Sequence, residues 1–232
     1  METTLDHSSF LSFLDDNITI AKKIQLLEQL DFENIQVLHE SYLFLEQKVL
    51  HDLATIDCID GTIYKRLFQS SNADISKKLT TNLQGGLVDP KSQFYASYLE
   101  LQDFLLVNDF QQADKLTSKI LCLLADTTSR NWLYFSDVKQ ISHSELKFLD
   151  NLWKIYSKGK FGFSIQRQIW LSNAEDWNAL WDKIGWRRED VLCRYPEDFI
   201  WDLTAPSGHL PLSNQLRGVQ TLKAIFNLTV WP

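Results

Sequence analysis

Apolar residues recur at helical spacing in the first third of the chain. Intervals of three and four residues place side chains on one face of an α-helix. Two such runs stand out, with apolar positions at Ile20, Ile24 and Leu27 in the first and at Leu38, Tyr42, Leu45 and Val49 in the second. The pattern predicts a small bundle of short amphipathic helices over residues 9 to about 81.

Two groups of turn-forming residues interrupt this helical pattern. Asp57–Gly61 (DCIDG) predicts a turn between helices, and Asn82–Pro90 (NLQGGLVDP) combines paired glycines with a proline. The second group is the stronger break, so we place a domain boundary near residues 82–92. The expected division is an N-terminal helical bundle at 1–88 and a second domain at 89–232.

The second part begins with further helical faces. Their apolar positions are Tyr98, Leu101 and Leu105, then Leu116, Ile120 and Leu123, then Leu146, Leu149 and Trp153. Asp109 with Gln112, and Ser142 with Glu145, have the spacing of capping boxes at helix starts. Alternating Val, Ile and Thr segments of useful length are missing from the sequence, so we predict an all-α fold.

Glycines and prolines divide the chain into short pieces after residue 157, which predicts long loops there. All eight tryptophans follow residue 131, and five of the seven arginines fall between 167 and 217. Aromatic rings on loops favour ligand binding, although tryptophans also fill protein cores. Trp132, Trp153 and Trp170 lie on helical patterns and are expected to belong to the scaffold, whereas the rings near Tyr195 suit a flat apolar ligand.

Composition and charge narrow the classes of function. The 232 residues are 44% hydrophobic and carry a net charge of −7, with −6 in residues 1–91 and −1 in residues 92–232. An acidic chain argues against general nucleic-acid binding, which needs a basic surface. Charged residues interrupt every apolar run, and the N-terminus has no signal or transit pattern, so we expect a soluble protein that acts where it is made.

Signatures of catalysis and metal binding are missing from the sequence. The three cysteines, Cys58, Cys122 and Cys193, are far apart and indicate neither a disulfide framework nor a metal site. Walker-A, His-Glu-x-x-His and Gly-x-Ser-x-Gly motifs do not occur. We therefore expect a binding protein that is not an enzyme and has no catalytic cofactor.

Four motifs resemble a known family. They are Trp132–Asp137 (WLYFSD), Phe161–Trp170 (FGFSIQRQIW), Phe199–Leu203 (FIWDL) and Gly208–Gly218 (GHLPLSNQLRG). These motifs, in this order, resemble those of the genomes-uncoupled-four family, the tetrapyrrole-binding accessory proteins of magnesium chelatase. The resemblance spans about residues 92–231. The resemblance implies a helical core shaped like a cupped hand, preceded in cyanobacterial members by a helical bundle. It also implies binding of protoporphyrin IX and magnesium protoporphyrin IX, with no chemistry of its own.

The resemblance implies porphyrin contacts at particular residues. Phe135 and Val138 match positions at the floor of the family's cup, with helix packing as the alternative. Arg217, in the Leu-Arg-Gly motif, is the candidate for pairing with a propionate or contacting the macrocycle, because guanidinium can hold a carboxylate through two hydrogen bonds. An internal salt bridge is its alternative role.

A loop that resembles the family's mobile flap carries Arg194 and Tyr195. Cyanobacterial relatives often have tryptophan at the position of Tyr195, so the aromatic face is kept while any contribution specific to indole is in doubt. Trp201 completes the candidate set, and both Trp201 and Trp186 have a buried supporting role as their alternative. His209 is a weak candidate for the magnesium of a metalloporphyrin, since Gly-His-Leu-Pro is more typical of a structural turn. Arg187 and Arg188 are expected in solvent or on a basic rim.

The resemblance also implies a partner and a location. We expect the large subunit of magnesium chelatase as partner, a monomeric state, and the chloroplast stroma, with the cyanobacterial cytoplasm as alternative. Peripheral membrane association is left open. The competing hypothesis is a helical interaction module that uses the same groove for a peptide or protein.

Overall fold

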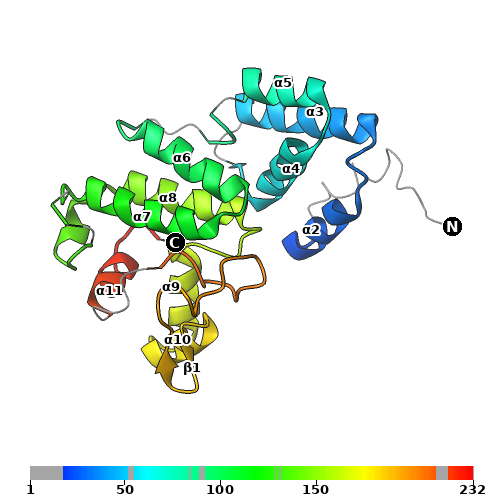
Figure 1. Ribbon diagram of the computed structural model, residues 1–232. Helices are drawn as coiled ribbons and strands as arrows, with labels where there is room; N and C mark the ends of the chain where they lie inside the picture. The colour runs from blue at the N-terminus through cyan, green and yellow to red at the C-terminus, as the bar shows by residue number, and fades with distance from the viewer. Residues whose placement is uncertain are drawn as a thin grey trace. The chain divides into compact units, whose positions relative to one another are not determined.

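The computed structural model describes residues 18–51, 55–83, 85–88, 92–127, 129–130, 132–212 and 219–231 (Figure 1). The chain divides into two compact units, residues 1–89 and 90–232. Helices make up nearly all the regular structure of the described residues, and the one hairpin among them pairs two strands of two residues each. The predicted all-α class is confirmed.

Four described helices build the first unit. They are α2 (Ile20–Gln29), α3 (Ile35–His51), α4 (Cys58–Gln69) and α5 (Ala73–Asn82). Helix α4 contacts the other three, so it lies at the centre of the unit. Leu27, Leu38 and Leu45 are almost fully buried, as their spacing predicts, whereas Ile20 is 54% exposed. The apolar stripe of α2 therefore faces the bundle only at its C-terminal end.

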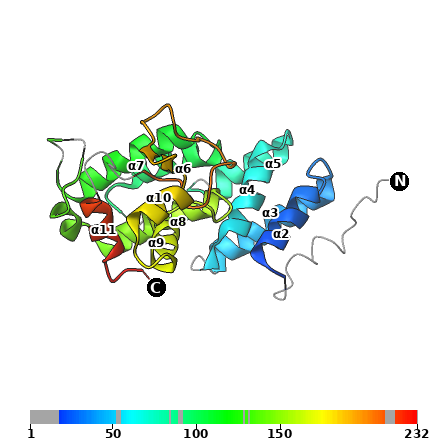
Figure 2. The same ribbon diagram turned by 90° about the horizontal axis from the view of Figure 1, so that it is seen from below.

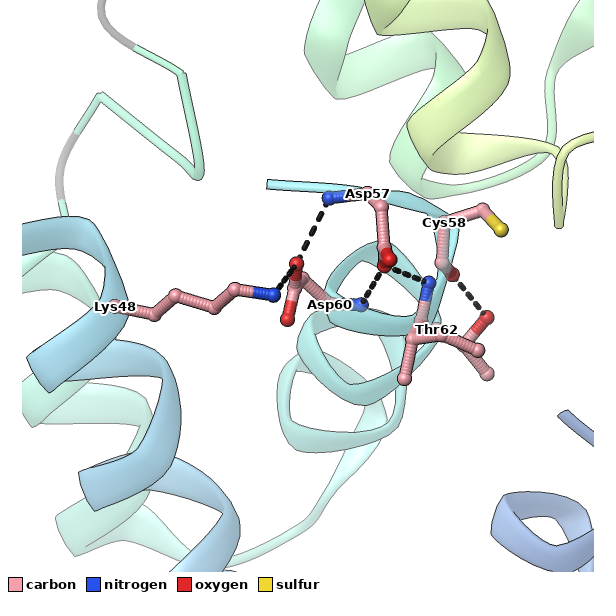
Figure 3. Close-up of polar contacts among 6 residues, drawn as sticks. Lys48, Asp57, Cys58, Asp60 and Thr62 are labelled. Carbon is pink, nitrogen blue, oxygen red and sulfur yellow. Dashed lines mark hydrogen bonds and ion pairs between the residues drawn. The ribbon is translucent and has the colours of Figure 1, made fainter. Parts of the chain in front are cut away.

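The predicted turn at Asp57–Gly61 is wrong, because the same residues begin a helix. Asp57 is the N-cap of α4, and its carboxylate accepts hydrogen bonds from the backbone of Ile59 (2.7 Å) and Asp60 (3.4 Å). The Asp60 carboxylate accepts in return from the Asp57 backbone N–H (2.8 Å), and Lys48 Nζ lies 2.6 Å from it (Figure 3). Aspartate and glycine favour helix N-termini as well as turns, so composition alone does not separate the two.

The second unit contains the remaining elements. Its helices are α6 (Tyr95–Leu106), α7 (Phe110–Leu124), the 3-10 helix η2 (Asp137–Gln140), α8 (His143–Tyr156), α9 (Phe163–Ser172), α10 (Trp177–Lys183) and α11 (Gln220–Phe226), and its hairpin joins β1 (Arg187–Arg188) to β2 (Val191–Leu192). Helix α6 packs against both α7 and α8, and α9 packs against α10 and α11 (Figures 1 and 2). No described helix is both long and apolar enough to cross a membrane.

The two predicted capping boxes have different outcomes. The Asp109 carboxylate accepts from the Gln112 backbone N–H (3.2 Å) at the start of α7, which confirms Asp109 as the N-cap and is one of the two hydrogen bonds of a capping box. Ser142 precedes α8 but makes no capping hydrogen bond with its side chain. Glu145 instead accepts from Ser92 Oγ (2.6 Å) and from the Tyr98 hydroxyl (2.5 Å), so it ties the start of the unit to α8.

The region after residue 157 is more helical than predicted. Glycines precede α9 and follow α10, so they separate short helices instead of marking continuous loops. Trp153 and Trp170 lie on α8 and α9 and are buried, in agreement with a scaffold role. Trp132 lies outside any helix and is half-buried, so its predicted helical position is wrong.

Candidate functional site

Three of the predicted site residues lie together on the segment that follows β2. The rings of Tyr195 and Trp201 meet edge to face, with centroids 5.8 Å apart, and the Trp201 indole N–H donates to the Pro196 carbonyl (3.0 Å). Arg194 and Asp198 exchange two hydrogen bonds, from the Arg194 backbone N–H to the carboxylate (2.8 Å) and from the Asp198 N–H to the Arg194 carbonyl (3.0 Å). Arg194 is exposed. The segment thus presents two aromatic rings and one guanidinium.

Phe135 and Val138 lie on a different segment, between α7 and α8. Phe135 is 57% exposed, whereas Val138 is fully buried in the 3-10 helix η2, which packs against α11. The Phe135 ring is therefore accessible from solvent, whereas Val138 belongs to the core of the unit. Both residues were predicted at the floor of the cup, but the structure gives them different exposures.

An ion pair that we did not predict holds the Phe135 segment. The Asp137 carboxylate pairs with the Arg130 guanidinium and accepts from the Tyr134 backbone N–H (2.7 Å). The same guanidinium lies 4.4 Å from the centroid of the Tyr134 ring, a cation–π arrangement. Tyr134 is 53% exposed, so it and Phe135 form an adjacent pair of exposed rings. In the sequence, this ion pair was indicated only by the opposite charges of Arg130 and Asp137, which flank Trp132–Phe135.

His209 is a structural residue in this fold. Its Nε2 accepts from the Ile200 backbone N–H (3.0 Å), and its Nδ1 lies 2.6 Å from the Ile184 carbonyl. The ring is therefore the neutral tautomer with its proton on Nδ1, and both nitrogens are occupied. Burial lowers the His209 pKa, which also favours the neutral form. Among the two roles considered for His209, this geometry favours the turn over a magnesium ligand.

Trp186 supports the same turn from inside the unit. It is fully buried, its indole N–H donates to the His209 carbonyl (2.8 Å), and its ring stacks on Trp181 at 5.1 Å. Arg187 is held by Asp182 through two hydrogen bonds of 2.7 and 2.6 Å. Of the roles predicted for these residues, Trp186 therefore has the buried supporting one, and the Arg187 guanidinium is already paired.

Two of the sequence motifs are joined by hydrogen bonds. Gln166 on α9 donates from its amide nitrogen to the carbonyls of Gly208 (2.9 Å) and Pro211 (2.8 Å). Gly208 has φ +77°, and a Cβ there would lie 3.0 Å from Ile169 Cδ1, so glycine is required by conformation and space. These contacts fix the chain that leads into residues 213–218.

Asp114 on α7 is a functional candidate that we missed. It is buried, and its Oδ1 accepts from the Leu212 backbone N–H (2.7 Å). Burial raises its pKa to about 7, against a smaller lowering by that hydrogen bond. Burial also raises the pKa of Tyr195, and the charge of Asp114 adds to this effect. The sequence could have indicated Asp114, because it places a carboxylate on the face of α7 that is otherwise buried, beside Ala113 and Thr117.

Arg217 lies outside the described residues, within the stretch 213–218 that connects Leu212 to α11. The other five predicted residues form two groups on separate segments, one around Tyr195 and one around Phe135. Within the described ranges, no group of three or more His, Cys, Asp or Glu side chains could hold a metal ion.

The chain is similar in sequence to known proteins. A family model described as GUN4-like matches residues 91–229. The Ycf53 protein of Porphyra purpurea is 42% identical over 214 residues, which are 91% of this chain and 90% of that protein. The chloroplastic tetrapyrrole-binding protein of Arabidopsis thaliana is 38% identical over 138 residues, 55% of this chain and 52% of its own.

A solved structure agrees in fold. GUN4 from Chlamydomonas reinhardtii is similar with a TM-score of 0.55 at 40% identity, and the match covers 58% of this chain and 89% of that one. The family match spans most of the second unit, and the Porphyra relative extends it over the first. The chain therefore belongs to the GUN4-like family.

Proposed function

We propose that the second unit binds a porphyrin, namely protoporphyrin IX and magnesium protoporphyrin IX, in support of chlorophyll synthesis. The observation that carries the proposal is the set of exposed aromatic rings on the Phe135 and Tyr195 segments in a member of the GUN4-like family. The Arabidopsis relative is named a tetrapyrrole-binding protein. A porphyrin is flat and apolar with acidic propionates at one edge, so it needs rings beside cations.

Each residue has a distinct role in this proposal. Phe135, Tyr195 and Trp201 contact the faces of the macrocycle, and Val138 holds the Phe135 segment against α11. Arg194 and Arg217 pair with the propionates, because a guanidinium makes charge-assisted hydrogen bonds with a carboxylate. His209 and Gln166 position the chain between these groups without contacting the ligand.

The protein acts in this proposal as a non-catalytic activator of magnesium chelatase, docking on its large subunit with porphyrin bound. It works as a monomer in the chloroplast stroma or, in a cyanobacterial setting, in the cytoplasm. Red algal Ycf53 relatives and a chloroplastic Arabidopsis relative support this location. A peripheral association with membranes is compatible with the proposal.

Titration with deuteroporphyrin tests the binding step. Tryptophan fluorescence should be quenched saturably, with a Kd in the low micromolar range or tighter, about −8 kcal/mol. Tyr195→Ala should weaken binding by about 1 kcal/mol, whereas Tyr195→Phe should bind like the parent, since the ring supplies the contact. Arg217→Ala should cost about 1–3 kcal/mol. Unsaturable quenching in the parent would contradict porphyrin binding.

A chelatase assay tests the regulatory step. Adding the protein to the purified chelatase subunits should raise the rate of magnesium insertion, and the Arg217→Ala variant should raise it less at limiting porphyrin. If the protein binds porphyrin but does not change the rate of magnesium insertion, activation is contradicted and porphyrin binding is not. Capture of a peptide or protein partner by porphyrin-free protein, at the Tyr195 segment, would favour the interaction module instead.

A further inference from the structure

Asp114 is a buried carboxyl group of the second unit that has no role among the proposed porphyrin contacts. It lies on α7 and is 2% exposed, on the helix face that also carries Phe110 and Thr117. Phe110 packs there against the rings of Trp153 and Phe161, with centroids 6.0 and 5.3 Å away. The carboxyl group therefore shares its helix face with part of the apolar core.

Within the described part of the chain, little stabilises a negative charge on Asp114. The Leu212 backbone N–H (2.7 Å) gives the one hydrogen bond that the described residues make to it. Lys115 lowers the pKa of Asp114, but this lysine is exposed and is only the next residue along the helix. A buried carboxyl group with so few partners favours its neutral form.

The titratable groups that the structure describes on neighbouring elements supply no second positive charge. On α6, which packs against α7 (Figures 1 and 2), Glu100 and Asp103 are both acidic and exposed. The charge of Glu100 acts on Asp103. His209, in the turn before Leu212, is neutral, because burial lowers its pKa and both ring nitrogens are bonded. The pH, and not an ion pair, therefore decides whether Asp114 is charged.

Tyr195 connects Asp114 to the proposed porphyrin site. The charge of Asp114 adds to burial in raising the pKa of the Tyr195 hydroxyl, so the two groups are close enough to interact electrostatically. The Tyr195 ring also meets Trp201 edge to face, with centroids 5.8 Å apart. Both rings contact the macrocycle in the porphyrin proposal. A porphyrin bound there would lie within the electric field of Asp114.

A bound porphyrin would raise the free energy of an ionised Asp114 in two ways. The apolar macrocycle replaces water over the Tyr195 segment, so the carboxylate is less well solvated. The two propionates bring negative charge into the same region, where burial limits screening by salt. A neutral Asp114 avoids both effects. Ligand binding and protonation therefore favour each other.

We propose that Asp114 couples porphyrin binding to proton uptake, so that the neutral acid permits tight binding and the carboxylate opposes it. By linkage, the same proton is held more firmly once the porphyrin is bound. Because the pKa of Asp114 is about 7 in the free protein, affinity should be highest near pH 6 and fall as the pH rises through 7. This role rests on the proposed porphyrin site and gives it a dependence on pH.

Deuteroporphyrin titrations of the full chain between pH 6 and 8.5 compare the parent with Asp114→Asn, which cannot ionise. Relative to the variant, the Kd of the parent should rise about tenfold across this range, as expected for one linked proton. Titration of the porphyrin itself affects both proteins equally, so the ratio of the two Kd values isolates Asp114. Asp126→Asn, at an exposed carboxylate, should follow the parent at every pH.

Proton uptake by the parent gives a second measurement that needs no variant. In weakly buffered solution at pH 7.5, an indicator dye should show that part of a proton is taken up for each deuteroporphyrin bound. A parent that takes up no proton would overturn the coupling, as would a ratio of Kd values that is constant from pH 6 to 8.5.

Two further outcomes are decisive. If Asp114→Asn is folded by circular dichroism but does not bind at pH 6, the carboxyl group is a contact for the ligand and the coupling is wrong. If no protein shows saturable quenching at any pH, the porphyrin proposal fails together with the coupling. Saturable quenching with parallel pH profiles would overturn the coupling and leave porphyrin binding standing.

Discussion

Single buried polar side chains hold the chain around the proposed porphyrin site. His209 and Asp114 each bond to backbone groups of the segments that lead to it. Both have pKa values moved by burial, in the direction that favours the neutral form. Because one is a base and the other an acid, they make the stability of the unit depend on pH in opposite ways.

His209 should make the second unit sensitive to acid. Its pKa is lower in the folded state than in the unfolded state, so its contribution to stability is present above about pH 6.5 and is lost as the pH falls through the folded value. His209→Gln should cost about 2 kcal/mol at pH 7.5 and flatten the pH dependence below it. Urea unfolding between pH 5 and 7.5 measures both, with the exposed His143→Gln as control. Parallel pH profiles for His209→Gln and the parent would contradict this.

Asp114 should have the opposite effect at higher pH. Its pKa is raised to about 7 in the folded state, so its stabilising contribution is present at low pH and is lost as the pH rises through about 7. Asp114→Asn keeps an oxygen to accept from Leu212 and cannot ionise. It should gain at least about 1 kcal/mol relative to the parent between pH 5 and 8. Asp126→Asn, at an exposed position, should gain nothing, and a constant difference for Asp114→Asn would refute the shift.

At the scale of the element, α9 begins with a cap from another helix. Gly162 precedes α9 at φ +138°, and the Asp150 carboxylate on α8 accepts from Ser164 in place of a local capping side chain. A Cβ on Gly162 would lie 2.7 Å from Asp150 Oδ1. The glycine of the FGFS motif is therefore required by both the conformation and the cap.

Gly162→Ala should destabilise the second unit by at least about 2 kcal/mol, because backbone strain adds to displacement of the Asp150 cap. Gly159→Ala is the matched variant, since Gly159 also has a positive φ of 75° but lies in the left-handed helical region that alanine reaches at roughly 1–2 kcal/mol. Urea unfolding followed by tryptophan fluorescence compares the two. Equal losses would show that Asp150 adds nothing at Gly162.

At the scale of the whole molecule, the two units can be followed by different spectroscopic signals. All eight tryptophans belong to residues 132–231, so their fluorescence reports on the second unit alone, whereas far-ultraviolet circular dichroism reports on the helices of both. The domain boundary expected between residues 88 and 89 remains a prediction, namely that the parts on either side of it fold independently. The distribution of tryptophan makes it testable in the intact chain.

If the units fold independently, the two signals should give different urea midpoints in the full chain. A shorter chain, residues 90–232, should then unfold with the same fluorescence midpoint as the full chain and still quench with deuteroporphyrin. Coincident transitions in the full chain, together with an unfolded short chain, would show instead that the units depend on each other.

Much of the helical scaffold could be predicted from the sequence, because it depends on local periodicity. The faces around Leu101, Ile120 and Leu149 follow from apolar spacing, and all three residues are buried. Prediction failed where the same residue types are common both in turns or loops and at the ends of helices. Asp57–Gly61 begins a helix instead of a turn, and the glycines after residue 157 separate short helices instead of marking loops.

The candidate site was predictable in its residue types and less so in its geometry. Phe135 and Val138 stand three residues apart with similar apolar character, yet one is exposed and the other buried, because α11 covers one side of η2. Asp114 was missed because its partner, Leu212, is 98 residues away in the sequence. No local pattern contains such a contact.

The sequence by itself determined the all-α class, the helical faces and the family, since periodicity and motifs are properties of neighbouring residues. Only the tertiary structure decided that His209 is bonded at both nitrogens, that Trp186 is a core residue, and that Asp150 caps α9. Those outcomes depend on which distant segments pack together, and burial and hydrogen bonding across them assign each side chain its role.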